Sequence, residues 1–348
     1  MMKKKWLQKN NSDFTFSEEQ KSVSFSKYIK NQIGKWLSIV LPILIGFFLI
    51  FYTYNKFTAA QILEIKSYFK NANYSYIYLA AFIAVLGNAS RAYRWKFSLE
   101  HMGYKSTFLN NFMAVSIGYV LNLTVPKSGE VSRALILKKY NNIPFDKGFG
   151  SIVAERLVDM LVLLLFIFLA VFLQFNIVKS FILDKIPVFK LILFFVIGTV
   201  LAALFILIYL YSKSKYILAV KQKISGLKEG VFSIIHMQKK WAYFFHTAFI
   251  WFSYILMFYV VFFVFPETSS LSISAIITSF VVGSIAIAFT NSGFGSYPFL
   301  ISKILLFYSI SETTGNAFGW IVWTSQMLVV LALGLFSFLF LPVFNRKK

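Results

Sequence analysis

The segment GFGSIVAERLVDMLVLLLFIFLAVFLQF, residues 148–175, is a long apolar run that carries three charged side chains, Glu155, Arg156 and Asp159. A transmembrane helix needs about 20 mainly apolar residues, so this run is long enough to cross a bilayer. Ionised side chains at that depth are costly, and they usually face the interior of a helix bundle and pair with one another. The segment therefore predicts a helix of a membrane bundle that has a polar core.

The composition of the whole chain indicates the same class of protein. Of its 348 residues, 58% are hydrophobic and 14% are charged, whereas a soluble domain has about 25% charged residues. The 42 Phe, 19 Tyr and 7 Trp residues exclude an intrinsically disordered chain. We therefore exclude a soluble enzyme and a nucleic-acid-binding domain. In a membrane protein, the net charge of +22 acts mainly as an orientation signal.

The apolar runs predict an all-α, polytopic membrane protein with about six full transmembrane helices and two broken units. The predicted spans are residues 37–54, 75–90, 148–175, 187–211, 242–265 and 315–341, inside a membrane domain of residues 37–341. The broken units are 107–125 with 129–140, and 271–290 with 297–310. Since twelve helical residues reach only about 18 Å, 129–140 is too short to cross a bilayer. We predict two re-entrant hairpins; the alternative is a pair of kinked spans among up to eight membrane segments.

The distribution of basic residues predicts how the chain lies in the membrane. Residues 1–36 form a Lys-rich tail and residues 342–348 a short basic C-terminus, and most of the 35 Lys and Arg residues fall on the side that holds both ends. The positive-inside rule makes that side cytoplasmic. The two hairpins then enter the membrane from opposite faces, an arrangement that transporters use to build a substrate site between interrupted helices. We predict a bacterial plasma-membrane protein with a polar cavity between the hairpins.

Two groups of charged residues near the first hairpin are the main candidates for a site. Glu130 and Arg133 follow the turn of the hairpin and are three residues apart, so they share a helical face. Glu155 and Asp159 share a face of the next span, and Arg156 points about 100° away from Glu155. One interpretation is a salt-bridged network that fixes the hairpin to its neighbour. In the other, the Arg side chains bind an anionic headgroup and the carboxylates balance charge or carry a proton or cation.

Further candidates lie at two predicted boundaries. Arg91 and Arg94, with Trp95, are predicted to end the second span at the inner interface, where they either gather anionic lipid headgroups or only orient the chain. The glycine turn that starts at Asn291 is predicted either to offer N–H groups to an anion or only to break the helix. A pair of small residues on the last span, Gly315 and Gly319, favours helix packing.

Several kinds of chemistry lack their usual signals in the sequence. The chain has no Cys, and its three His residues are isolated, so we predict no metal site and no cofactor. No nucleophile elbow and no phosphate-binding glycine loop is present, so we predict no catalytic residue of those classes.

The residues quoted above occur in a familiar order. Arg91-x-x-Arg94-Trp95, then Gly129-Glu130 with Arg133, then Glu155-Arg156-Leu157-Val158-Asp159 resembles the transmembrane, flippase-like family of lysylphosphatidylglycerol synthases, over roughly residues 37–341. The resemblance implies a membrane domain that moves lipids or lipid-linked headgroups between leaflets. It also implies that five charged residues match the polar core of that domain: Glu130, Arg133, Glu155, Arg156 and Asp159.

The chain differs from this family pattern in two ways. Larger relatives fuse the domain to a soluble aminoacyl-transferase domain that this sequence does not contain, so we do not expect lysyl-lipid synthesis. The second glycine turn of the family is often preceded by Pro and followed by an acidic residue, whereas here those places hold Asn291 and Tyr297-Pro298. The lipid that is recognised therefore need not be aminoacylated phosphatidylglycerol.

Three functional hypotheses follow. The first is translocation of a phosphate-bearing lipid, with a membrane phospholipid or a polyprenyl-linked lipid as the partner and no nucleic acid. The second is a membrane-embedded transferase that acts on a polyprenyl-phosphate-linked substrate, with Glu155 or Asp159 as the base. The third is a non-transporting scaffold. A second copy of the chain or a separate lipid-modifying enzyme is a further expected partner.

Overall fold

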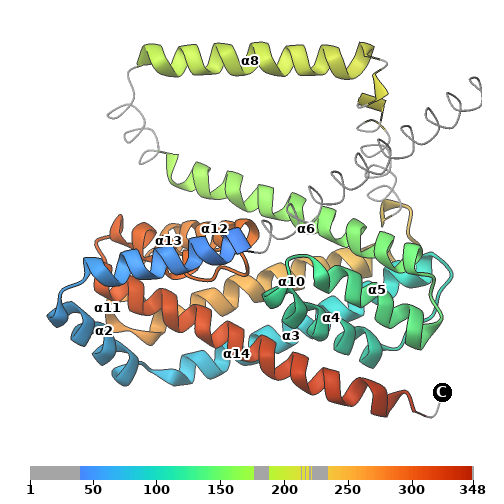
Figure 1. The fold of residues 1–348 in the computed structure, drawn as a ribbon, viewed down its shortest axis with the longest axis horizontal. Coiled ribbons are helices and arrows are strands. Elements are labelled where there is room, and N and C mark those ends of the chain that lie inside the picture. The colour runs from blue at the N-terminus through green and yellow to red at the C-terminus, as the bar shows by residue number, and fades with distance from the viewer. Residues whose placement is uncertain are drawn as a thin grey trace, which may run out of the picture.

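The computed structural model describes residues 40–175, 188–212, 214–215, 217–218, 221 and 234–346. The regular structure of these residues is helical, with no strand among them, so the predicted all-α fold is confirmed. Most of the long helices lie side by side along the long axis of the molecule, and the helix Val188–Tyr211 lies apart from them (Figure 1). The tail predicted for residues 1–36 lies outside the described residues.

A helix is present at each of the six predicted spans. These helices are Val40–Lys56, α3 (Tyr74–His101), α6 (Phe145–Leu173), α8 (Val188–Tyr211), α10 (Lys240–Val261) and α14 (Glu312–Phe344). Among the described residues, α6, α14 and α10 with its short extension η1 (Phe262–Val264) are long and apolar enough to cross a bilayer. The helix Val40–Lys56 and α2 (Ala59–Asn71), bent by 114°, would form a fourth crossing. The chain is a helical membrane protein, and the number of full spans, six, stays a prediction.

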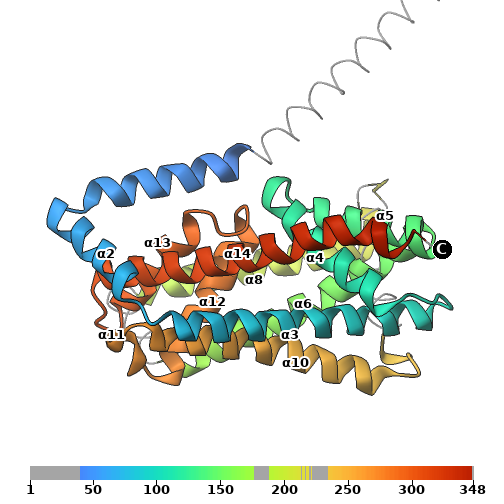
Figure 2. The same cartoon turned by 90° about the horizontal axis from the view of Figure 1, so that it is seen from below.

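Both predicted breaks are present as helical hairpins. The first pairs α4 (Phe108–Thr124) with α5 (Ser128–Asn141), and the second pairs α12 (Ile273–Phe289) with α13 (Ser296–Leu306). The first hairpin lies at the end of the molecule that holds the C-terminus, and the second lies towards the other end, near α2 and α11 (Pro266–Ser269) (Figure 2). At 1.5 Å per residue α4 is about 25 Å long, shorter than the roughly 30 Å hydrocarbon core of a bilayer. How the hairpins insert in the membrane stays a prediction.

Helix α14 contacts both hairpins and holds them in one bundle. A Cβ atom built on Gly319 would lie 2.7 Å from Cα of Pro298 in α13, and one on Gly315 would lie 3.0 Å from Cα of Ser302. These glycines let the two backbones approach closely, so the predicted packing role is confirmed. Near the other end of α14, Asn345 Nδ2 donates a hydrogen bond to Asn110 Oδ1 of α4 at 2.9 Å.

The turns of the two hairpins touch each other. Asn291 Nδ2 donates a 2.8 Å hydrogen bond to the carbonyl oxygen of Leu123, at the end of α4. Beside it, Ser292 Oγ lies 3.5 Å from the carbonyl oxygen of Asn122. The ends of broken helices leave carbonyl groups without intrahelical partners, and inside a bilayer such groups must find partners within the protein. The contact supplies one of these partners from the opposite hairpin.

A substitution in the first hairpin tests its close packing. A Cβ atom on Gly129 would lie 2.1 Å from the carbonyl oxygen of Gly118, so the two arms would have to separate. We expect Gly129→Ala to lower the free energy of unfolding by about 1–3 kcal/mol, measured as thermal unfolding in detergent micelles. Gly150→Ala is the control, because its Cβ would meet nothing within 4 Å. Equal effects of the two substitutions would contradict the packing described here.

Cysteine labelling tests the predicted orientation of the two hairpins. The chain has no Cys, so single cysteines at the exposed positions Lys105, before α4, and Ser270, before α12, are unambiguous reporters. With six full spans, an impermeant maleimide should label Ser270→Cys in intact cells and Lys105→Cys only after permeabilisation. Labelling of both from the same side would show that one of the broken units crosses the membrane.

Candidate functional site

Helix α3 continues beyond the predicted boundary and carries two arginines into the core. The span was predicted to end at residue 90, but α3 runs to His101, and Arg91 and Arg94 are 2% and 0% exposed. Both side chains are therefore buried among protein helices instead of exposed at the end of the span, and their depth in the membrane stays a prediction. The cause is pairing: charges that would end a membrane helix on their own can be buried when opposite charges on another helix meet them.

These arginines belong to a buried ion-pair network between α3, α5 and α6. Arg91 Nη1 contacts Glu155 Oε1 and lies 2.7 Å from Asp159 Oδ2. Arg94 lies 2.9 Å from Asp159 Oδ1 and 3.2 Å from Glu155 Oε1. Arg133 Nη2 of α5 donates to Glu155 Oε2 at 2.9 Å. No side chain of the five is more than 11% exposed. The structure thus brings together two groups of candidates that lie far apart in the sequence.

A second ion pair lies at the edge of this network. Arg156 Nη2 is 2.9 Å from Glu130 Oε1, and the two side chains are 39% and 18% exposed. Glu130 and Arg133 share a helix but have different partners, because Arg133 reaches inwards to Glu155. Asn122 Nδ2 lies 3.4 Å from Glu130 Oε2, which joins this pair to the end of α4.

Side chains that the sequence did not single out complete the site. Helix α10 contributes Thr247, which accepts a hydrogen bond from Arg94 at 3.1 Å, and Tyr254, whose hydroxyl accepts one from Arg91 at 3.1 Å. Neither residue belongs to a recognisable motif, so no sequence signal identifies them. Trp95 was expected at an interface, but it is fully buried, and its ring lies 4.1 Å from Cζ of Arg133. This cation–π contact fixes the direction of the Arg133 side chain.

The site holds more buried donors than acceptors. The Nε groups of four arginines have no hydrogen-bond partner; these are Arg91, Arg94, Arg133 and Arg156. A buried donor without an acceptor carries its full desolvation cost, and such groups in native proteins often mark the place of a missing ligand or water. These Nε groups can therefore donate to an additional acceptor. Guanidinium groups form their strongest hydrogen bonds with oxyanions.

Asn291 lies outside this network, and its turn uses its N–H groups internally. The backbone N–H of Gly293 donates to Thr290 Oγ1, and that of Tyr297 donates to the carbonyl oxygen of Gly293. The Asn291 amide contacts Leu123, as described above. These bonds favour the helix-breaking interpretation of the turn over anion binding.

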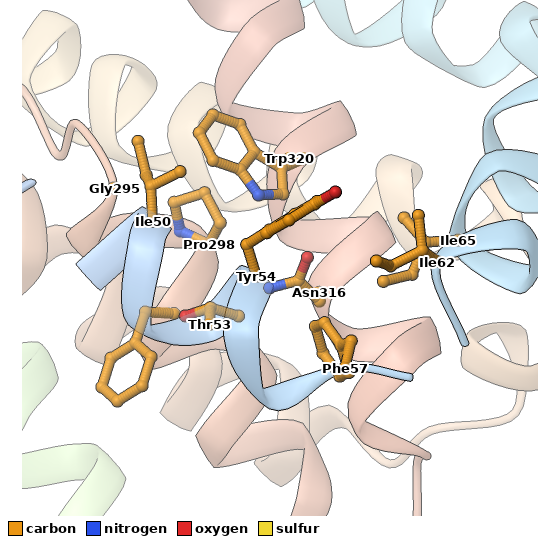
Figure 3. A pocket seen from close by; sticks show the side chains of 11 residues that line it. Ile50, Thr53, Tyr54, Phe57, Ile62, Ile65, Gly295, Pro298, Asn316 and Trp320 are labelled. Carbon is orange, nitrogen blue, oxygen red and sulfur yellow. The ribbon is translucent and has the colours of Figure 1, made fainter. Parts of the chain in front are cut away.

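A separate cavity of about 230 Å³ lies between Val40–Lys56, α2, α13 and α14 (Figure 3). Its lining is mainly apolar and contains none of the charged candidates; it includes Ile50, Phe57, Ile65, Pro298, Asn316 and Trp320. Within the described parts of the chain, no group of three His, Cys, Asp or Glu side chains could hold a metal ion.

Comparison with protein families identifies the class to which this network belongs. Residues 39–344 match the family described as the lysylphosphatidylglycerol synthase TM region. The chain belongs to this family. The resemblance inferred from the charged motifs is confirmed, and the family connects this membrane protein with membrane lipids.

Two known proteins are similar to part of the chain. The UPF0104 membrane protein MJ1595 of Methanocaldococcus jannaschii is 34% identical over 99 residues, 28% of this chain and 30% of that protein. The glycosyltransferase AglD of Haloferax volcanii is 34% identical over 101 residues, 28% of this chain and 16% of that protein. Each alignment covers less than a third of the relative. No solved structure is similar enough to the chain to count as a match.

Removal of one carboxylate tests how far the network supports the fold. Asp159→Asn leaves Arg91 and Arg94 short of a buried counter-charge, and breaking a buried ion pair costs about 3–5 kcal/mol. We expect a loss of that size in denaturant-induced unfolding in micelles. Asp146→Asn, at an exposed position in the first turn of the same helix, should cost less than about 1 kcal/mol. Equal losses would contradict a stabilising role for the network.

Proposed function

We propose that the protein moves a phosphate-bearing lipid or lipid-linked headgroup between the two leaflets of the membrane. The observation that carries this proposal is the set of four guanidinium groups whose Nε donors are buried without acceptors. A phosphate group offers several strong acceptor oxygens with a geometry that suits arginine. The headgroup would meet Arg133 and Arg156, while the acyl or prenyl chains stay in the bilayer.

The exposure of the charged groups supports a route to this site. Arg156 and Glu130 are the only partly exposed members of the described ion-pair network, so a headgroup would meet them first. Arg133 lies three residues further along the same short helix, and its side chain is 3% exposed. A headgroup that displaces Glu130 from Arg156 would then reach the unpartnered Nε of Arg133. Glu155 and Asp159 hold the remaining arginines in place.

The contact between the hairpins supports a protein with two-sided access. The turn of the second hairpin closes on the end of α4 through Asn291 and Leu123, near the residue that bonds Glu130. Sites at the meeting point of two opposed interrupted helices are typical of transporters. In this proposal both termini are cytoplasmic, the membrane is a bacterial plasma membrane, and a second copy or a lipid-modifying enzyme is a further partner.

A transferase is the second candidate, because a partial relative, AglD, is named a glycosyltransferase. The similarity covers 16% of that protein, so its activity is not carried over to this chain as a whole. Formation of a glycosylated lipid by the purified protein would favour this candidate over translocation.

Leaflet exchange in proteoliposomes tests the proposal. We expect the protein to exchange fluorescent anionic phospholipids, and Arg133→Gln to slow the exchange by about tenfold to hundredfold, the equivalent of one or two charge-assisted hydrogen bonds. Glu155→Gln should slow it as well, since Glu155 holds three arginines. Lys138→Gln removes the same charge from an exposed position on the same helix and should have no effect.

Matched amounts of folded protein, verified by thermal unfolding, separate loss of activity from loss of fold. No exchange by the folded wild type with any anionic phospholipid would refute translocation of phospholipids. Exchange at the wild-type rate in both Arg133→Gln and Glu155→Gln would refute a role of the charged network.

A further inference from the structure

The charges of the network do not balance. Its positive members are Arg91, Arg94, Arg133 and Arg156, and its negative members are Glu130, Glu155 and Asp159. Four guanidinium groups face three carboxylates, so one positive charge is in excess. The excess is the same when the outer pair is left out, since Arg156 and Glu130 neutralise each other.

No described neighbour removes this excess. The other polar groups that border the arginines are hydroxyls, those of Tyr119, Tyr243, Tyr254 and Thr247, and none of them is a carboxylate. The nearest other carboxylate on α3, Glu100, is occupied with Lys96 and Lys239 at the end of the helix. An uncompensated charge in a buried site is strongly unfavourable, so the site is built for one further negative charge.

From this imbalance we infer that the site selects lipids whose headgroup carries a single net negative charge, a phosphate diester with an otherwise uncharged substituent, and that Glu130 sets this preference. The inference rests on the proposed function and narrows its substrate class. A zwitterionic headgroup would leave the positive charge in excess. A phosphate monoester, which approaches two negative charges at neutral pH, would reverse the imbalance.

Glu130 is the member whose removal changes the charge with the least disturbance to the core. It is 18% exposed, and it pairs with Arg156 rather than with the three buried arginines. Its replacement by Gln raises the excess from one positive charge to two, which matches a phosphate monoester. We therefore expect the substitution to change the preferred headgroup from a phosphate diester to a phosphate monoester, instead of only abolishing binding.

The test compares three tail-labelled lipids in phosphatidylcholine vesicles at pH 8: phosphatidylglycerol, a diester; phosphatidic acid, a monoester; and zwitterionic phosphatidylcholine. We expect the wild type to exchange phosphatidylglycerol about tenfold faster than the other two. In Glu130→Gln, the ratio of the phosphatidic acid rate to the phosphatidylglycerol rate should rise about tenfold. Glu100→Gln, which removes a carboxylate outside the network, should leave the ratio unchanged.

Equal rates for the three lipids in the wild type would overturn the inference while leaving translocation in place. An unchanged ratio in Glu130→Gln would overturn the role of this residue. Thermal stabilisation of the detergent-purified protein by the same lipids gives a readout that does not depend on transport. Selective stabilisation by phosphatidylglycerol without any exchange would support the charge preference and refute translocation. Equal stabilisation by inorganic phosphate would mean that the ligand is a free ion, and would overturn the inference.

Discussion

The architecture depends on the cost of placing ionised groups in a membrane bundle. Glu155 and Asp159 lie in a long apolar helix, where a carboxylate without a partner is costly. Their partners come from α3 and α5, so three helices and the first hairpin are tied to one place in the bundle. The same pairing explains why α3 continues as a helix beyond residue 90, although the next turn contains two arginines.

The second constraint is the backbone of the broken helices. Inside a bilayer, the free carbonyl groups at a helix break must be satisfied by the protein, because no water is available there. Each hairpin therefore needs a neighbour at its turn. In this fold the two turns contact each other, and Asn291 donates a hydrogen bond to the carbonyl oxygen of Leu123. Small residues allow the approach: Gly129 lies against the backbone of the facing arm, and Gly319 lies against α13.

The network and the contact between the hairpins lie close together. Asn122 bonds Glu130 on one side and contacts the turn of the second hairpin on the other. Displacement of Glu130 would therefore disturb Asn122, and through it the contact between the two hairpins. A purely structural network would need no spare donors, whereas here the Nε groups of four arginines have no acceptor.

The sequence by itself determined the class of protein, the positions of the helices and breaks, the family, and the shared face of Glu155 and Asp159. These properties follow from apolar run length, helix periodicity and motif order, all of which are local in the chain. Only the tertiary structure decided which charge meets which. It buried Arg91 and Arg94 among other helices, paired Glu130 with Arg156, and added Thr247 and Tyr254 from α10. Partners that are more than twenty residues apart leave no local pattern, because their proximity is set by how the helices pack.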